Sequence, residues 1–399
     1  MPDRLRVLFV DDEPRILDGL RRMLHGLRHN WAMDFVATGP EALARLAQAP
    51  FDVIVTDMHM PHMSGGQLLA EVKRCYPQVV RIVLSGAADR ADILNALGPI
   101  HQYLSKPCEA DVLKITLARV AALPGWLADT QLQRLILQIE ALPSWPTRYD
   151  ALTRELAAVA PAMSVVGDVI ARDIGLTAKV MQLAQSAVFS TRPIASLAEA
   201  VAFLGVDTLR LIAASGRVFM RLEAAACVDL PLAALWTHSV LVGRLARQIA
   251  ASEGADQQTQ EYAAIAGLLH DVGKLIMAAH LPDQYATAVA LETRAGLSSE
   301  QAERQIFHAT HAEAGAYLLG LWGLADPIVA ATAFHHDPQV GGAKHFSVIT
   351  AVYAADCLAH QTGAEPRLDA AYLADLGLTA RLPEWQRLCQ LTLQEKDMP

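Results

Sequence analysis

Two apolar runs near the start of the chain each stop at a carboxylate. Leu5–Val10 stops at Asp11 and Asp12, and Val53–Thr56 stops at Asp57. Continuous apolar runs of this length are typical of strands buried on both faces of a parallel sheet. The pattern therefore predicts an α/β domain with acidic side chains at the ends of its strands.

Two further runs extend this pattern. Arg81–Leu84 is followed by Ser85, and His101–Leu104 leads to Lys106. In an open parallel sheet, functional groups gather at the carboxyl ends of the strands. A hydroxyl and an ammonium group at that edge can both hold phosphoryl oxygens.

Three carboxylates at one sheet edge repel one another unless a cation joins them. Oxygen ligands from one or two carboxylates, completed by water and phosphate, suit Mg²⁺. We therefore predict a magnesium site at Asp11, Asp12 and Asp57, with Asp57 as the acceptor of a phosphoryl group.

Four segments carry a resemblance to a known family: Val10–Glu13, Asp57–Gly65, Leu84–Gly86 and Tyr103–Pro107. Over residues 4–122 the chain resembles the receiver domain of two-component response regulators. The resemblance implies a flavodoxin-like sheet of five parallel strands in the order 2-1-3-4-5, and phosphorylation of Asp57 by a histidine kinase. It also implies that Ser85 and Lys106 bind the phosphoryl group and that Tyr103 is an aromatic switch.

A connector is expected at residues 123–142. Leu123–Gly125 is a break, and apolar residues then recur at helical spacing as far as Leu142, with polar residues between them. Such a helix either docks on its own chain or pairs with a second chain. The stripe is short for a coiled coil, which favours docking.

Residues 143–362 read as an all-α domain, because alanine and leucine dominate and glycine and proline separate segments of helix length. Residues 363–399 read as a helical tail. The segments Leu142–Pro146, Ile170–Met181, Ile194–Val201 and Phe203–Gly205 resemble the HDOD family. That family is similar in fold to the HD phosphohydrolases but usually lacks their metal ligands, which implies a regulatory output that acts on a protein partner.

The helical domain carries an ordered set of five histidines and two aspartates. Imidazole and carboxylate groups on several helices that face one interior can assemble a transition-metal site. The candidate ligands are His238, His270, Asp271, His311, His335, His336 and Asp356. We interpret the nine other histidines as ordinary core or surface residues: His25, His29, His59, His62, His101, His280, His308, His345 and His360.

This ligand set resembles the HD superfamily of metal-dependent phosphohydrolases. The resemblance gives primary-ligand roles to His238, His270, Asp271 and Asp356. It matches His311, His335 and His336 to the extra ligands of the HD-GYP phosphodiesterases, and Lys274 to the lysine after their histidine-aspartate pair. Lys274 would then either bind phosphate or be a cation at an ordinary helix end. The Gly-Tyr-Pro motif is missing after His336, which argues against a cyclic-di-GMP substrate. The expected metal is Fe, Mn or Zn.

Composition narrows the choice of function. The net charge of −9 and the lack of a basic run disfavour direct DNA binding. Five cysteines without a CxxC pair, and no apolar stretch of 18 residues, favour a cytoplasmic protein without a membrane span. We expect a response regulator that acts on a protein partner, with homodimerisation possible. The alternative is a phosphorylation-regulated metal-dependent phosphodiesterase or phosphohydrolase.

Overall fold

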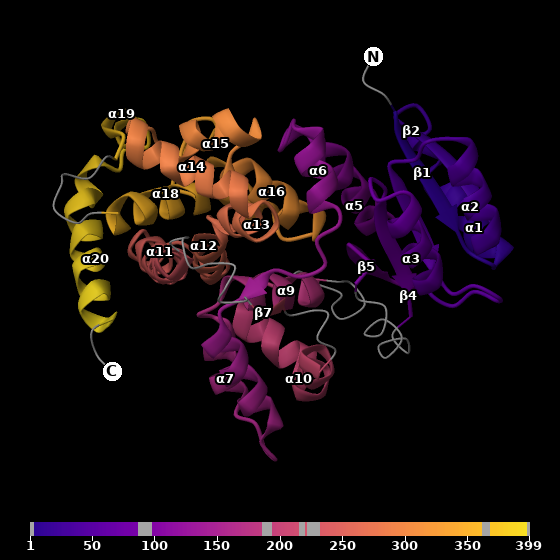
Figure 1. Cartoon of the computed structure of the whole chain (residues 1–399), viewed down its shortest axis with the longest axis horizontal. Coiled ribbons are helices and arrows are strands. Elements are labelled where there is room, and N and C mark those ends of the chain that lie inside the picture. The colour runs from indigo at the N-terminus through magenta and orange to yellow at the C-terminus, as the bar shows by residue number, and fades with distance from the viewer. Residues whose placement is uncertain are drawn as a thin grey trace.

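The structure is a computed structural model that describes residues 4–86, 98–185, 194–214, 220–221, 232–360 and 368–396 of the 399-residue chain. An α/β domain lies at one end of the molecule, and the helices of the second domain extend away from it (Figure 1). Helix α6 lies between the two (Figure 1).

The first domain is built on one sheet of five parallel strands in the order β2-β1-β3-β4-β5, which confirms the predicted topology. Val10 lies opposite Val36 on one side and Thr56 on the other, so the strands end at one edge. The residues of β3 and β4 are all buried, which explains their continuous apolar runs. The strands are β1 (Leu5–Val10), β2 (Trp31–Val36), β3 (Val53–Asp57), β4 (Val80–Ser85) and β5 (Gln102–Ser105).

Helices cover this sheet, and α2 and α3 begin at side-chain caps. Thr38 accepts a hydrogen bond from Glu41 N at the start of α2, and Ser64 and Gln67 form a capping box on α3. The described helices are α1 (Pro14–Met23), η1 (His25–Leu27), α2 (Gly39–Gln48), α3 (Gly65–Cys75), α5 (Ala110–Ala122) and η3 (Leu123–Gly125).

The second domain is helical, as predicted, except for a short parallel pair formed by β6 (Pro143–Ser144) and β7 (Met220–Arg221). Two residues per strand are too few to leave a recognisable pattern in the sequence. The helices are α7 (Pro146–Ala157), α8 (Met163–Ile170), α9 (Ile174–Gln185), α10 (Leu197–Ala214), α11 (Leu232–Ser252), α12 (Gln257–Leu269), α13 (Val272–His280), α14 (Pro282–Ala295), α15 (Ser299–Phe307), α16 (His311–Leu321), α17 (Asp326–Phe334) and α18 (Val348–Ala359).

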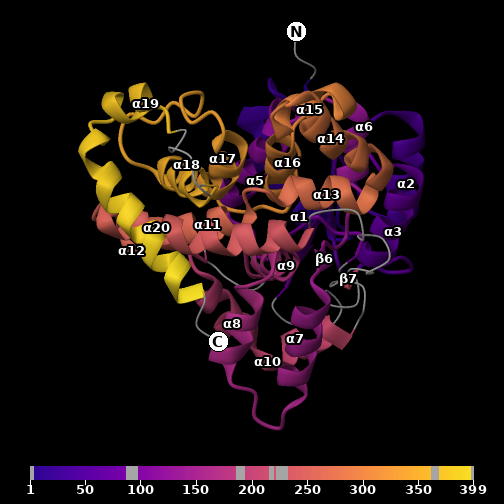
Figure 2. The same cartoon turned by 60° about the vertical axis from the view of Figure 1, so that its left-hand side comes forward.

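These helices form two groups. The smaller group is α7–α10, and the larger group is α11–α18. Helices α7, α8 and α10 project from the molecule, while α9 packs against α12 of the larger group (Figure 2). Among the described helices, the run Gln257–His280 is long and apolar enough to cross a membrane by length and composition alone. Most of this run is buried inside the domain, as is usual for a core helix.

The C-terminal tail packs back on the larger group. It forms α19 (Ala370–Asp375), η5 (Thr379–Arg381) and α20 (Leu382–Lys396), and α20 lies across α11 and α18 (Figure 2). The fully buried Trp385 anchors it, because its indole N–H donates to Glu253 Oε1 at 2.9 Å. Arg381 donates to the same oxygen at 2.7 Å.

The connector docks inside its own chain. Helix α6 (Thr130–Ile136) packs against α16 through the buried Leu132 and Ile136. The Leu137 carbonyl, one residue further on, accepts hydrogen bonds from the Arg81 guanidinium on β4 (2.7 Å) and from the ring of His101, which directly precedes β5 (2.9 Å). Docking, one of the two roles expected for this helix, is therefore the one that the structure has.

Candidate phosphoacceptor and metal sites

Two carboxylates meet one lysine at the carboxyl end of the first sheet. Asp57 ends β3, and Asp11 follows the neighbouring strand β1. Lys106 Nζ lies 2.7 Å from Asp11 Oδ2 and 2.5 Å from Asp57 Oδ1. The Lys106 backbone N–H donates to Ser85 O at 2.8 Å, which fixes the lysine to the end of β4.

The other two predicted residues lie on the neighbouring strands. Ser85 is fully buried and ends β4, one position beyond Leu84, the residue that pairs with Asp57. Tyr103 lies inside β5, opposite Val83, and burial raises its pKa well above the usual value. Ser85 therefore lies at the edge of the site, on the strand next to Asp57, and Tyr103 lies one strand further along the sheet.

The loop after β3 holds the Asp57 carboxylate from the other side. The His59 backbone N–H donates to Asp57 Oδ2 at 3.1 Å. A Cβ atom at Gly65 would lie 2.0 Å from Asp57 O, so only glycine allows α3 to begin this close to the strand end. Burial raises the pKa of Asp57, although Lys106 opposes that shift.

These residues fit a magnesium ion. Asp11 and Asp57 share a single ammonium group, and the half-buried Asp12 adds a third carboxylate directly after β1. One lysine cannot balance three carboxylates, and oxygen donors of this kind suit a hard cation.

The structure also brings together all seven predicted ligands of the helical domain, which lie in overlapping groups of close donor atoms. Six helices or helix ends supply them. His238 lies on α11, His270 follows α12, Asp271 precedes α13, His311 begins α16, His335 and His336 follow α17, and Asp356 lies on α18.

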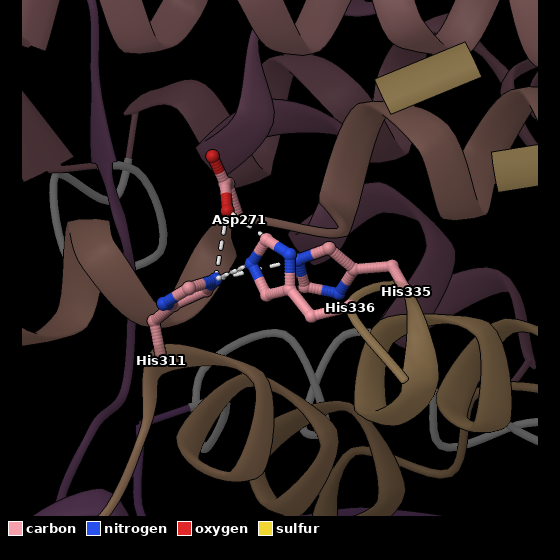
Figure 3. Close-up of side chains that lie close together, drawn as sticks. All are labelled: Asp271, His311, His335 and His336. Carbon is pink, nitrogen blue, oxygen red and sulfur yellow. Dashed lines mark hydrogen bonds and ion pairs between the residues drawn. The ribbon is translucent and has the colours of Figure 1, made fainter. Parts of the chain in front are cut away.

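One part of the cluster is centred on His311, and its side chains point toward one another (Figure 3). His311 Nε2 lies 3.1 Å from Asp271 Oδ1. It lies 3.3 Å from His335 Nε2 and 3.0 Å from His336 Nε2. Four donor atoms of the kind that ligate transition metals therefore face one point.

The other part is centred on Asp356. Its Oδ1 lies 2.9 Å from His238 Nε2 and 3.5 Å from His270 Nε2. His270 Nε2 also lies 3.5 Å from Asp271 Oδ2, so this histidine stands between the two carboxylates. The adjacent pair His270 and Asp271 thus links the two parts.

Groups outside the cluster orient its imidazoles. In His270, His311 and His335, Nδ1 faces a carbonyl or carboxylate oxygen, which can only accept a hydrogen bond. Nδ1 of each ring therefore carries a proton, and Nε2 points toward the centre of the cluster. The donor and acceptor pairs are His270 Nδ1 to Gly267 O (2.7 Å), His335 Nδ1 to Thr332 O (2.8 Å) and His311 Nδ1 to Glu303 Oε2 (2.7 Å).

A close helix contact places Asp271 beside His311. A Cβ atom at Gly273 would lie 1.9 Å from His311 O, so glycine is required where α13 meets the start of α16. Lys274, one residue further on, lies 2.8 Å from Asp271 Oδ2 through its Nζ. The predicted lysine is therefore next to the cluster and paired with a predicted ligand.

The surroundings of the cluster shift the pKa values of its residues. Burial opposes ionisation of Asp271, but Lys274 and His270 outweigh burial and hold its pKa well below the usual range. Burial lowers the pKa of His238 and lowers that of His335 to about 4. An ionised aspartate and a neutral imidazole are the protonation states that bind metals.

His311 differs from the other histidines. Burial lowers its pKa, but the carboxylate of Glu303 outweighs burial and raises it to about 9. A proton is therefore held on a ring whose Nε2 faces Asp271 Oδ1 and two further imidazoles. The site stabilises positive charge at the point where a metal ion would lie.

The donor set fits a transition metal. Nε2 of His270 is buried, and the nearest carboxylate oxygens, Asp271 Oδ2 and Asp356 Oδ1, both lie 3.5 Å away, beyond ordinary hydrogen-bond distance. A buried polar atom without a partner is costly unless a ligand or ion satisfies it. Mixed imidazole and carboxylate donors suit Fe, Mn or Zn better than Mg²⁺.

Two residues of this region were not singled out from the sequence. Glu303, on α15, is 1 % exposed and holds His311, but nothing in its local sequence separates it from an ordinary helix glutamate. His360 is expected from the sequence to be an ordinary core or surface residue, yet its Nδ1 lies 3.1 Å from Asp356 Oδ1. The four-residue spacing from Asp356 on one helix was the available signal.

Comparison with known families gives the class of the protein. The response regulator receiver domain matches residues 7–118, and the HDOD domain matches residues 142–338. The chain therefore carries a response regulator receiver domain followed by an HDOD domain.

Individual relatives are similar in sequence to parts of this chain. The hydrogenase transcriptional regulatory protein HoxA of Cupriavidus necator is 34 % identical over 160 residues, which are 40 % of this chain and 32 % of HoxA. The transcriptional regulatory protein KdpE of Mycobacterium tuberculosis is 33 % identical over 34 % of this chain and 58 % of KdpE. This chain thus spans less than two thirds of either relative.

One solved structure matches much of the fold. The MmoQ response regulator of Methylococcus capsulatus superposes with a TM-score of 0.50 at 24 % identity, over 62 % of this chain and 98 % of that one. This similarity supports the architecture.

Proposed function

We propose that this protein is a phosphorylation-controlled signalling regulator. A histidine kinase phosphorylates Asp57, and the HDOD domain passes the change to a protein partner. The observation that carries this proposal is the contact of Lys106 with both Asp11 and Asp57 at the strand ends. Mg²⁺ held by Asp11, Asp12 and Asp57 would neutralise the incoming phosphoryl group.

The coupling follows from the strands themselves. Strand β4 carries Ser85 at one end and Arg81 near the other, and β5 carries Tyr103 two residues after His101. Arg81 and His101 both donate to Leu137 O of the connector. A phosphoryl group that draws Ser85 inward and moves Tyr103 would therefore shift the strands that hold the connector.

The HDOD domain contacts the same strand directly. The Gln102 side chain donates to Leu321 O at 2.8 Å, and Gln182 of α9 donates to His101 O at 3.0 Å. Both helix groups of the HDOD domain are thus bonded to the start of β5, and both would sense its movement.

The test of this function is phosphorylation with a small-molecule donor. Asp57→Asn should abolish Mg²⁺-dependent labelling by acetyl phosphate, because the amide cannot form the acyl phosphate. Asp111→Asn, a change at an exposed aspartate of α5, should label normally. Undiminished labelling of Asp57→Asn would refute the assignment.

The coupling has its own measurement. Addition of beryllofluoride, a phosphoryl mimic, should change hydrogen exchange in residues 98–142 of the wild type and leave Asp57→Asn unchanged. Identical exchange with and without the mimic would refute transmission through β5 and the connector.

A second candidate function is metal-dependent hydrolysis of a phosphodiester or phosphomonoester. The observation that favours it is the assembly of all seven predicted ligands. Transition metals held there would supply an activated water and positive charge for a phosphate group. Lys274 holds Asp271 in place and adds a cation beside the cluster. Without a Gly-Tyr-Pro motif, cyclic di-GMP is not the proposed substrate.

Metal analysis separates these functions. The purified protein reconstituted with Fe²⁺, Mn²⁺ or Zn²⁺ should retain metal, and His270→Ala combined with Asp271→Ala should release it. A wild type that binds no metal would refute the centre. A metal-loaded protein that hydrolyses no phosphate ester would leave the signalling function with a structural metal.

The proposal also includes a cytoplasmic location, no direct DNA binding and a homodimer. The net charge of −9 supports the lack of DNA binding. Val112 and Ile115 of α5 are 37 % and 52 % exposed, and two apolar side chains on one receiver helix support an interface between two copies.

A further inference from the structure

We propose that His360 is an additional ligand of the metal centre and that it forms, with His238 and Asp356, an outer metal position. The proposal rests on the metal centre of the proposed function and extends it. His360 is the C-cap residue of α18.

The geometry brings three donors together. His238 Nε2 lies 2.9 Å and His360 Nδ1 lies 3.1 Å from Asp356 Oδ1. The two imidazole rings are 4.3 Å apart between centroids. Asp356 and His360 are four residues apart, so one helix turn presents both on the same face. Two imidazoles and a carboxylate are the donor types that transition metals prefer.

Exposure is greatest at His360. The side chains of His270, His311 and His335 are 0 % exposed, whereas those of His238, His336 and His360 are 16 %, 27 % and 59 % exposed. The cluster therefore has a buried end and an end that opens to solvent, and His360 lies at the open end. A metal that reacts needs a coordination position that water or substrate can enter.

The outer position has a chemical consequence. Three protein ligands leave room for water and for one oxygen of a phosphate group. Asp356 also faces His270, so its carboxylate can be shared with the inner part of the cluster. Because it has fewer ligands and is more exposed, the outer ion should be the first one lost to a chelator.

A simpler role for His360 must be separated from this one. Its Nδ1 also lies 3.0 Å from Asp356 O, so the ring can act only as a hydrogen-bonding group at the helix end. That role predicts an effect on thermal stability without metal. A ligand role predicts an effect on the number of ions bound.

The experiment measures bound metal on the full chain. Wild type, His360→Ala, His360→Gln and the control His345→Ala, an exposed histidine outside every donor group of the described residues, are stripped, reloaded with Zn²⁺ and analysed after gel filtration. Both His360 variants should hold about one Zn²⁺ per chain less than the wild type. His345→Ala should match the wild type. Glutamine retains a hydrogen-bond donor, so His360→Gln isolates the loss of the ligand.

Each other result overturns the inference. Equal Zn²⁺ content and equal affinity in wild type and His360→Ala would show that His360 is only a helix-end group, while the inner centre would stand. Loss of all Zn²⁺ from His360→Ala, with the metal-free melting temperature unchanged, would refute a separate outer position. A wild type that binds no Zn²⁺, Mn²⁺ or Fe²⁺ would refute the proposed metal centre itself and this extension with it.

Discussion

Glu303 controls both the orientation and the charge of His311. Its Oε2 accepts hydrogen bonds from His311 Nδ1 and from the His311 backbone N–H, each at 2.7 Å. The ring is thereby fixed with Nε2 toward Asp271 Oδ1. Resemblance to HD proteins predicts the candidate ligands because they follow one another in a known order. A single buried glutamate carries no such order, so only the folded chain reveals it.

This residue gives a prediction about metal affinity. Glu303→Gln should weaken metal binding by about 10–100-fold, because the ring loses a charged partner that orients it and raises its basicity. Glu155→Gln is the control, since Glu155 lies on α7 and belongs to no group of candidate donor atoms among the described residues. Competition with a chromophoric chelator measures both affinities. Equal affinities would refute the role of Glu303.

At the scale of elements, hydrophobic patterns predicted most of the fold. The buried strands of the receiver appear as continuous apolar runs, and their carboxyl ends meet because the sheet is parallel. The helical character of the second domain followed from composition. What the sequence could not predict was how closely two helices approach, because that distance depends on packing between residues far apart in the chain.

The contact between α13 and α16 is such a case. Gly273→Ala would place a methyl group 1.9 Å from His311 O, so one helix must move and carry Asp271 away from His311. We expect a loss of stability of about 1–3 kcal/mol or more and loss of metal binding. Gly167→Ala is the control, because Gly167 lies inside α8 with open space at its Cβ position and should gain about 0.5–1 kcal/mol. Urea unfolding checks both changes, and a stable Gly273→Ala protein would contradict the argument.

At the scale of the whole molecule, receiver, connector and HDOD domain meet around one buried lysine. Lys179 of α9 donates to Glu140 O at 2.6 Å and lies 5.0 Å from the centre of the Trp322 ring. The Glu140 carboxylate contacts Lys73 of the receiver helix α3. A lysine in an apparently apolar helix gave no sign of this role in the sequence, since the junction exists only after three segments have packed.

The burial of Lys179 predicts how stability depends on pH. Burial lowers its pKa to about 7, against 10.5 when exposed, although Glu140 opposes the shift. Between these values the unfolded chain binds more protons at this residue than the folded chain, so its contribution to stability rises with pH by up to about 1.4 kcal/mol per unit. Below pH 7 the lysine is charged in both states, so its burial lowers the stability of the folded state by the full amount.

Lys179→Met removes this pH-dependent contribution, so the stability of the wild type relative to that variant should increase from pH 7 to pH 10. Urea unfolding followed by tryptophan fluorescence measures the difference, with Lys344→Met, at an exposed lysine, as the control. A difference that stays constant with pH would show that Lys179 remains charged at the junction.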